Sequence, residues 1–123
     1  MTARRRRVLL IEQDAFIVML LEEAFARLGA EVRPVYDSVA ALTAMAEDAY
    51  DQVVLALHPL AVPEAADLLR RLAVIAPNPL PVLVTTSFQM TNAERQVIEA
   101  ACTGPVAFVM KPFNDEELAL ALA

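Results

Sequence analysis

The run Val53-Val54-Leu55-Ala56-Leu57 decides the fold class, because it is apolar at every position. A strand with one face in water alternates between apolar and polar residues, whereas a strand of a parallel sheet, covered by helices on both faces, stays apolar throughout. Three further short runs largely share this character: residues 8–11, 82–85 and 106–110. Residues 31–36 predict one more strand, which Pro34 restricts to the edge of a sheet. Since amphipathic helical stretches alternate with these segments, we predict an α/β fold: a doubly wound (βα)5 domain with a five-stranded parallel sheet.

The composition excludes several classes of protein. The chain has 123 residues, of which 58% are hydrophobic and 21% charged, which fits one globular domain and excludes disorder. A single cysteine, Cys102, excludes a disulfide framework and gives no zinc-binding pattern. The net charge of −6 argues against direct DNA binding, and no apolar run is long enough to cross a membrane. We therefore expect a soluble, cytoplasmic domain.

The N-terminus carries a block of four arginines, residues 4–7, just before the first apolar run. We expect residues 1–7 to form a solvated basic arm and residues 8–123 to form the folded domain. The alternative is that these arginines contact phosphate, nucleic acid or an acidic partner.

Helix ends are marked by capping signals. Capping residues, a proline at the first helical position and one capping box, Thr91 with Glu94, predict five helix starts. The other four are at Asp14, Ser38, Pro63 and Asn114 with Glu117. The two glycines of the chain, Gly29 and Gly104, fall where helical patterns stop. We expect both to be left-handed residues just after a helix.

Ligands of doubly wound sheets bind beyond the carboxyl ends of the strands, which selects four short segments for inspection. They are Glu12-Gln13-Asp14, Leu57-His58, Thr85-Thr86-Ser87 and Lys111-Pro112-Phe113. Lys111 is the only lysine, and a compact ammonium beside acidic and hydroxyl groups is suited to holding an anionic group such as phosphate. The alternative is a surface lysine that precedes a turn.

Together these residues resemble the receiver domain of bacterial two-component response regulators, over essentially the whole chain. The segments that carry the resemblance are Ile11-Glu12, Asp51-Gln52-Val53-Val54-Leu55, Leu68-Leu69-Arg70-Arg71-Leu72, residues 81–86 and Ala107-Phe108-Val109-Met110-Lys111-Pro112-Phe113. The Lys-Pro-Phe ending is the most specific of them. The resemblance implies the flavodoxin-like form of the fold, with strand order 2-1-3-4-5.

In that family an acidic pair after the first strand and an aspartate ending the third strand coordinate magnesium, and this aspartate accepts a phosphoryl group from a histidine kinase. A Thr or Ser and a Lys then contact the phosphoryl oxygens, and an aromatic residue changes rotamer. The resemblance assigns these roles in order to Glu12 and Gln13, Ala56, Thr86, Lys111 and Phe108. It also implies that the bond before Pro112 is cis.

Two of these positions depart from the family pattern. Gln13 stands in the acidic pair, and Ala56 stands at the phosphoacceptor position. A methyl group cannot form an acyl phosphate, and magnesium needs carboxylate oxygens. We therefore expect a degenerate site with no catalytic residue, no metal and no cofactor, hence no enzyme. With its usual partner missing, Lys111 should contact Glu12 or turn outward to solvent.

Other residues could replace the missing acceptor, but each has a structural interpretation that we favour. His58 is interpreted as a loop residue or hydrogen-bonded neighbour. Asp14 is interpreted as a helix cap. Thr86 and Ser87 have no general base nearby that the sequence identifies, and Cys102 falls in a core pattern.

The sequence thus favours a pseudo-receiver of a two-component or phosphorelay system that acts by phosphorylation-independent protein–protein interaction. The resemblance points to residues 92–123 as the face for a histidine kinase, a phosphotransfer protein or another regulator, or for a homodimer. A receiver with a displaced phosphoacceptor is one alternative. A sensor that binds a small anion or metabolite in the vacated pocket near Ala56, through Lys111 and Thr86, is another. The short last helix, residues 114–123, would also fit a truncated part of a longer protein.

Overall fold

A computed structural model describes residues 5–57 and 61–122. Within these ranges strands and helices alternate in the predicted order: β1 Arg6–Ile11, α1 Ala15–Arg27, β2 Ala30–Val35, α2 Ser38–Glu47, β3 Gln52–Ala56, α3 Val62–Ile75, β4 Val82–Thr86, α4 Asn92–Ala101, β5 Val106–Met110 and α5 Asp115–Leu122. No helix in the described part of the chain is long and apolar enough to span a membrane.

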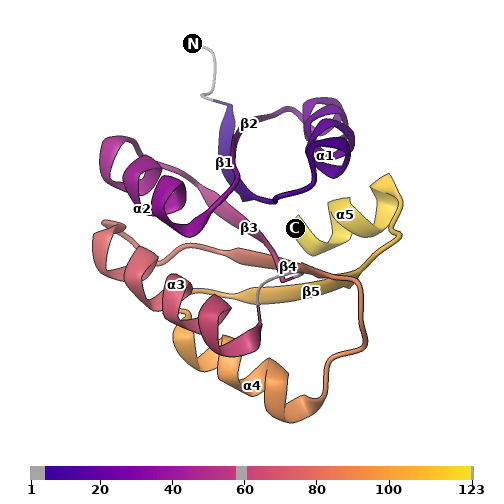
Figure 1. Ribbon diagram of the computed structural model, residues 1–123. Coiled ribbons are helices and arrows are strands. Elements are labelled where there is room, and N and C mark those ends of the chain that lie inside the picture. Colours follow the sequence, from indigo (N-terminus) through magenta and orange to yellow (C-terminus); the bar gives the residue numbers. More distant parts are fainter. Residues whose placement is uncertain (1–4, 58–60, 123) are drawn as a thin grey trace.

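The strands form one parallel sheet in the order β2-β1-β3-β4-β5, which confirms the predicted flavodoxin-like topology. β2 lies at an edge, the position that Pro34 predicts. Helices α1 and α5 cover one face of the sheet, and α2, α3 and α4 cover the other (Figure 1). Helices therefore cover both faces of the sheet, as a doubly wound fold requires.

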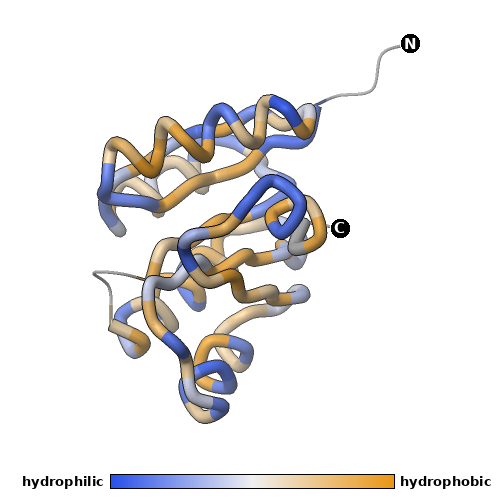
Figure 2. Tube along the Cα trace, turned by 90° about the vertical axis from the view of Figure 1, so that its right-hand side faces the viewer, coloured by the Kyte–Doolittle hydropathy of each residue, from blue (hydrophilic) through white to orange (hydrophobic). Residues whose placement is uncertain are grey.

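The core is divided by the sheet into two apolar clusters. Leu10, Val54 and Leu83 pack on the side of α1 and α5, where Phe25 and Leu118 are fully buried. Their strand neighbours pack on the opposite side, against α2, α3 and α4: Leu9, Leu55 and Val84. In Figure 2 hydrophobic stretches follow the strands, whereas hydrophobic and hydrophilic stretches alternate along the helices. This two-sided burial explains why the central strands are apolar at successive positions.

Most of the predicted helix starts are confirmed. Asp14 caps α1, and Thr91 with Glu94 forms a reciprocal capping box at α4. Asn114 and Glu117 exchange backbone-to-side-chain hydrogen bonds of 3.3 Å and 2.8 Å before α5.

Two helix starts were predicted one residue away from their true place. The cap of α2 is Asp37, whose carboxylate accepts from the Ala40 N–H at 2.7 Å, and Ser38 is already helical. A carboxylate is as good a cap as a hydroxyl, so the adjacent Asp and Ser could not be separated by sequence. In α3 the first helical residue is Val62, which makes Pro63 the second.

The two glycines have different roles. Gly29 has a φ of 79° after α1, as predicted. The same prediction is wrong for Gly104, because no other described glycine has a positive φ. At Gly104 the backbone passes so close to the neighbouring chain that a Cβ would lie 2.5 Å from the Leu80 carbonyl oxygen. Gly104 is therefore needed for a close approach and not for a left-handed conformation.

The first strand begins at Arg6, inside the segment expected to form the basic arm. The Arg7 guanidinium lies 2.5 Å from the Asp48 carboxylate and over the Tyr50 ring, 5.3 Å from its centroid. The Arg7 N–H donates to the Asp51 carboxylate at 2.8 Å. Arg7, which precedes the apolar part of β1, is thus fixed by partners more than 40 positions away in the sequence.

Candidate functional site

The carboxyl ends of four strands bring the predicted site residues together. Glu12 follows β1, Ala56 ends β3, Thr86 ends β4 and Lys111 follows β5. Ala56 pairs with Thr85 in the β3–β4 register, and the Lys111 N–H donates to the Thr86 carbonyl at 2.8 Å. The parallel sheet thus assembles residues that are up to 99 positions apart in the chain.

An ion pair lies at the centre of this site. The Lys111 Nζ donates to the Glu12 Oε1 at 2.8 Å, which confirms the predicted contact. The Glu12 side chain is only 2% exposed and that of Lys111 20% exposed. The second carboxylate oxygen of Glu12 accepts from the Asp14 N–H at 3.2 Å. Both oxygens of this buried carboxylate therefore have donors within the protein, as a buried charge requires.

The two predicted departures from the family pattern, Ala56 and Gln13, occupy different environments. Ala56 ends the central strand β3, and its methyl group is buried. Gln13 is exposed. Asp14, the next acid along the chain, accepts from the backbone N–H groups of Phe16 at 2.9 Å and Ile17 at 3.4 Å. Its carboxylate caps α1, as predicted.

The hydroxyls of β4 differ in their hydrogen bonding. The buried Thr86 hydroxyl donates to the Phe88 carbonyl at 2.8 Å and accepts from the Phe88 N–H at 3.0 Å. It therefore stabilises the loop that leads to α4. The Thr85 hydroxyl is buried with no hydrogen-bond partner in the structure. Ser87 is exposed.

The aromatic residue of β5 is covered by α4. The Phe108 ring is half-buried and packs against the core cluster under α2, α3 and α4. The Arg95 guanidinium lies over the ring, 5.4 Å from its centroid, in a cation–π contact. The Arg95 Nε is buried without a hydrogen-bond partner. The peptide bond between Lys111 and Pro112 is cis, as expected.

The remaining candidate residues from the sequence are Cys102 and His58. Burial, with a smaller contribution from Glu99, raises the pKa of the Cys102 thiol to about 11, so the unreactive thiol form prevails at neutral pH. The prediction for His58 lies outside the described residues.

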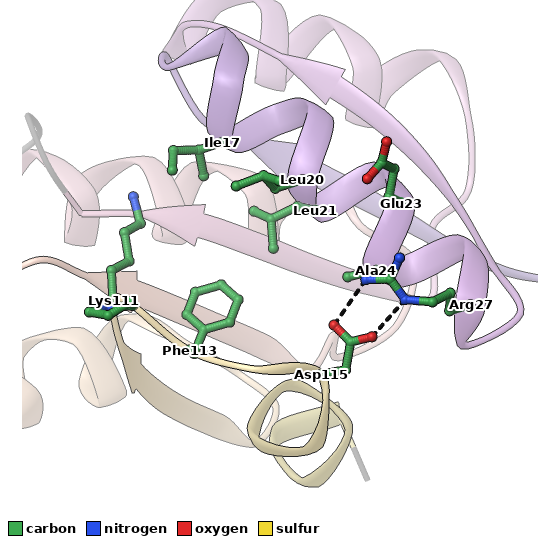
Figure 3. A pocket seen from close by; sticks show the side chains of 10 residues that line it. Ile17, Leu20, Leu21, Glu23, Ala24, Arg27, Lys111, Phe113 and Asp115 are labelled. Atoms are coloured by element: carbon green, nitrogen blue, oxygen red, sulfur yellow. Dashed lines mark hydrogen bonds and ion pairs between the residues drawn. The ribbon is translucent and has the colours of Figure 1, made fainter.

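A groove of about 400 Å³ between α1 and the segment after β5 was missed by the sequence reasoning. Ile17 and Leu20 of α1 face Phe113 across it, and Lys111 lines it as well (Figure 3). The Arg27 guanidinium joins α1 to Asp115 of α5 through hydrogen bonds of 2.6 Å and 3.0 Å. The signal in the sequence is the surplus of apolar residues on α1, of which Phe16, Met19 and Leu20 stay exposed.

Residues 8–123 match the family described as response regulator receiver domain. The chain belongs to this receiver family. It is therefore a receiver domain of two-component signalling.

Solved structures show the same fold at low sequence identity. One is the receiver domain of a sensor histidine kinase from Pseudomonas aeruginosa, with a magnesium ion coordinated in its active-site cleft; the identity is 21%, the TM-score 0.78, and 97% of this receiver and 95% of that chain are covered. The Vibrio cholerae chemotaxis protein CheY4 is 20% identical, with a TM-score of 0.79 and 97% of both chains covered. A response regulator from Thermotoga maritima is 18% identical, with a TM-score of 0.83 and coverages of 97% and 95%. No curated protein gives a significant match.

Proposed function

We propose that this receiver is a pseudo-receiver: a non-phosphorylatable, non-enzymatic module that transmits its signal by binding protein partners. The observation that carries the proposal is the methyl group of Ala56 at the end of β3, the position to which the resemblance assigns the phosphoacceptor carboxylate. No pH or ion condition makes a methyl group accept a phosphoryl group.

Three neighbouring oxygen-bearing side chains offer poor substitutes, because each already has a structural partner. Glu12 is paired with Lys111, Asp14 caps α1, and the Thr86 hydroxyl is bonded to Phe88. A displaced phosphoacceptor at any of these three residues would have to give up its present interaction before it could react.

The anion-sensor alternative has less support for the same reason. The positive charge that would attract an anion, on Lys111, is neutralised by Glu12 at 2.8 Å. The arrangement therefore favours protein binding over anion binding.

The surface formed by α4, β5 and α5 (the α4–β5–α5 face) is the proposed site for a histidine kinase, a phosphotransfer protein or another regulator. Apolar side chains are exposed on β5 and α5, at Met110 and Leu120. Between α4 and β5 the Arg95 guanidinium lies over Phe108, and Arg and aromatic side chains are frequent anchors of protein interfaces. A second copy of this chain is the other occupant that the face could take.

Intact mass after incubation with magnesium and acetyl phosphate tests the absence of phosphorylation, with an ordinary receiver as the positive control. We expect no change in mass. A gain of one phosphoryl group would contradict the proposal, and mapping it to Asp14, His58 or Thr86 would identify a displaced acceptor.

Two matched methionines test the partner face. Met110 on β5 and Met19 on α1 are similarly exposed, at 44% and 47%. With histidine kinases, phosphotransfer proteins and regulators of the same organism as candidate partners, we expect Met110→Glu to abolish binding and Met19→Glu to preserve it. The reverse result would move the partner site to α1. Sedimentation of both variants would show whether the partner is a second copy.

A further inference from the structure

We propose that the Lys111 ammonium is the resident cation of this site and makes the receiver independent of magnesium. The family places a divalent ion at the carboxyl ends of the strands, so the first question is whether the residues present here could hold one. This inference rests on the proposed function in using the same site positions, but it concerns metal binding in the unphosphorylated protein.

The oxygen ligands do not fit a magnesium ion. Magnesium needs near-octahedral oxygen ligands and is usually held by one or two carboxylates with several waters. Ala56 supplies no oxygen, Gln13 is exposed and neutral, and the Asp14 carboxylate caps α1. Glu12 is the one carboxylate left at the site positions that the structure describes. In the same ranges no group of three or more acidic, histidine or cysteine side chains could hold a metal ion.

The remaining carboxylate is already neutralised. The Glu12 Oε1 accepts from the Lys111 ammonium at 2.8 Å, and its Oε2 accepts from the Asp14 N–H at 3.2 Å. A divalent cation bound to Glu12 would lie within a few ångströms of the ammonium, and repulsion between like charges is strong in a buried site. Binding would therefore require the ion pair to separate first.

The position of Lys111 makes such separation costly. Its side chain is 20% exposed and lines the wall of the groove between α1 and the segment after β5 (Figure 3). Its backbone N–H is bonded to Thr86 of β4 at 2.8 Å. The main chain of Lys111 is thus fixed to β4 while its ammonium contacts Glu12, and Glu12, at 2% exposure, cannot turn to water without rearrangement.

The experiment is a thermal unfolding series on the whole chain without any phosphodonor. The Tm of the wild type is measured in EDTA and in millimolar magnesium chloride, with an ordinary receiver as a positive control. We expect the wild-type Tm to be the same in both buffers. A saturable rise of the Tm with magnesium that Glu12→Gln removes would overturn the inference.

A second arm tests the role of the ammonium itself. Lys111→Met keeps the apolar stem but leaves Glu12 buried without its cation, and we expect a fall in Tm of at least about 5 °C. Glu12→Gln combined with Lys111→Met removes both charges, and we expect it to recover most of that loss. Arg71→Met, which breaks the exposed pair with Asp67, serves as the control and should change the Tm little.

If Lys111→Met is as stable as the wild type, the ammonium is not what neutralises Glu12 and the inference is wrong. These readouts are separate from those of the proposed function. A gain of phosphoryl mass would contradict the absence of phosphorylation, whereas a magnesium-dependent Tm would contradict only the resident-cation role of Lys111.

Discussion

At position 56 a methyl group stands at the site to which the resemblance assigns the phosphoacceptor carboxylate, and Lys111 stands at the site that it assigns to the phosphoryl-contacting lysine. The Lys111 Nζ instead pairs with the Glu12 carboxylate, whose Oε1 lies 2.8 Å away. The lysine is therefore part of a largely buried pair whose charges cancel.

Restoring the missing acids should restore the chemistry. In Ala56→Asp combined with Gln13→Asp, the new carboxylates join Glu12 at the strand ends and supply the oxygens that magnesium needs. We expect one phosphoryl group per chain after incubation with magnesium and acetyl phosphate, measured by intact mass. Ala56→Asn combined with Gln13→Asp is the control of nearly equal volume and should gain no mass. A folded double-aspartate variant that stays unmodified would show that further residues block the reaction.

The structural role of Asp14 can be separated from a chemical one. Because its carboxylate caps α1 through the N–H groups of Phe16 and Ile17, Asp14→Ala should destabilise the fold by about 1 kcal/mol. Asp14→Ser, which offers another good cap, should retain most of the stability. Urea denaturation of both variants measures the difference. Equal losses in both would argue that the carboxylate acts through something other than capping.

At the scale of the elements, the connections that follow α1 and α4 each contain a glycine, but the two glycines are needed for different reasons. After α1 the chain turns through a left-handed glycine, Gly29, whereas after α4 it passes under the Leu80 carbonyl at Gly104. At Gly29 the requirement is a positive φ, whereas at Gly104 it is the absence of a side chain where the backbone of Leu80 lies close. The sequence pattern is the same in both places, since each glycine follows an amphipathic stretch.

Substitutions should distinguish these two constraints. Asparagine tolerates a left-handed conformation, so Gly29→Asn should cost less stability than Gly29→Ala, for which we expect about 1 kcal/mol. At Gly104 any side chain meets the Leu80 backbone, so Gly104→Ala should cost about 1–3 kcal/mol and Gly104→Asn at least as much. Chemical denaturation of the four variants is the measurement. A Gly104→Asn variant more stable than Gly104→Ala would contradict the steric explanation.

At the scale of the whole molecule, the sequence predicted the fold from patterns that are local. Apolar strands, helix caps and the order of elements need only neighbouring residues, and they led to the five-stranded parallel sheet, whereas its strand order came from the resemblance to receiver domains. The Glu12–Lys111 contact was also predictable, because few groups of opposite charge lie at the strand ends. What remained hidden depends on distant pairs: the Leu80 backbone beside Gly104, Arg95 over Phe108, and the groove between α1 and α5. Such contacts leave no periodic signal in a single sequence.

Ion pairs between residues far apart in the sequence also predict how the stability of the fold depends on pH. The Arg7 guanidinium, which joins β1 to the segment before β3, lowers the pKa of Asp48 from 3.8 to about 2. Arg27 likewise lowers the pKa of Asp115, across the groove. Because these pKa values are lower in the folded than in the unfolded chain, the folded state binds fewer protons in acid. Their stabilising contribution is therefore complete above the unfolded pKa and is lost as the pH falls through the folded one.

For Asp48 this window lies between a pH of about 4 and a pH of about 2. We expect the free energy of unfolding to fall with decreasing pH there, and Asp48→Asn to flatten the dependence while lowering stability at neutral pH. Asp48→Asn combined with Asp115→Asn should flatten it further, and added salt should weaken the effect because the pairs are exposed. Urea denaturation across this pH range measures the slopes. An unchanged slope in the double variant would place the acid sensitivity in other carboxylates.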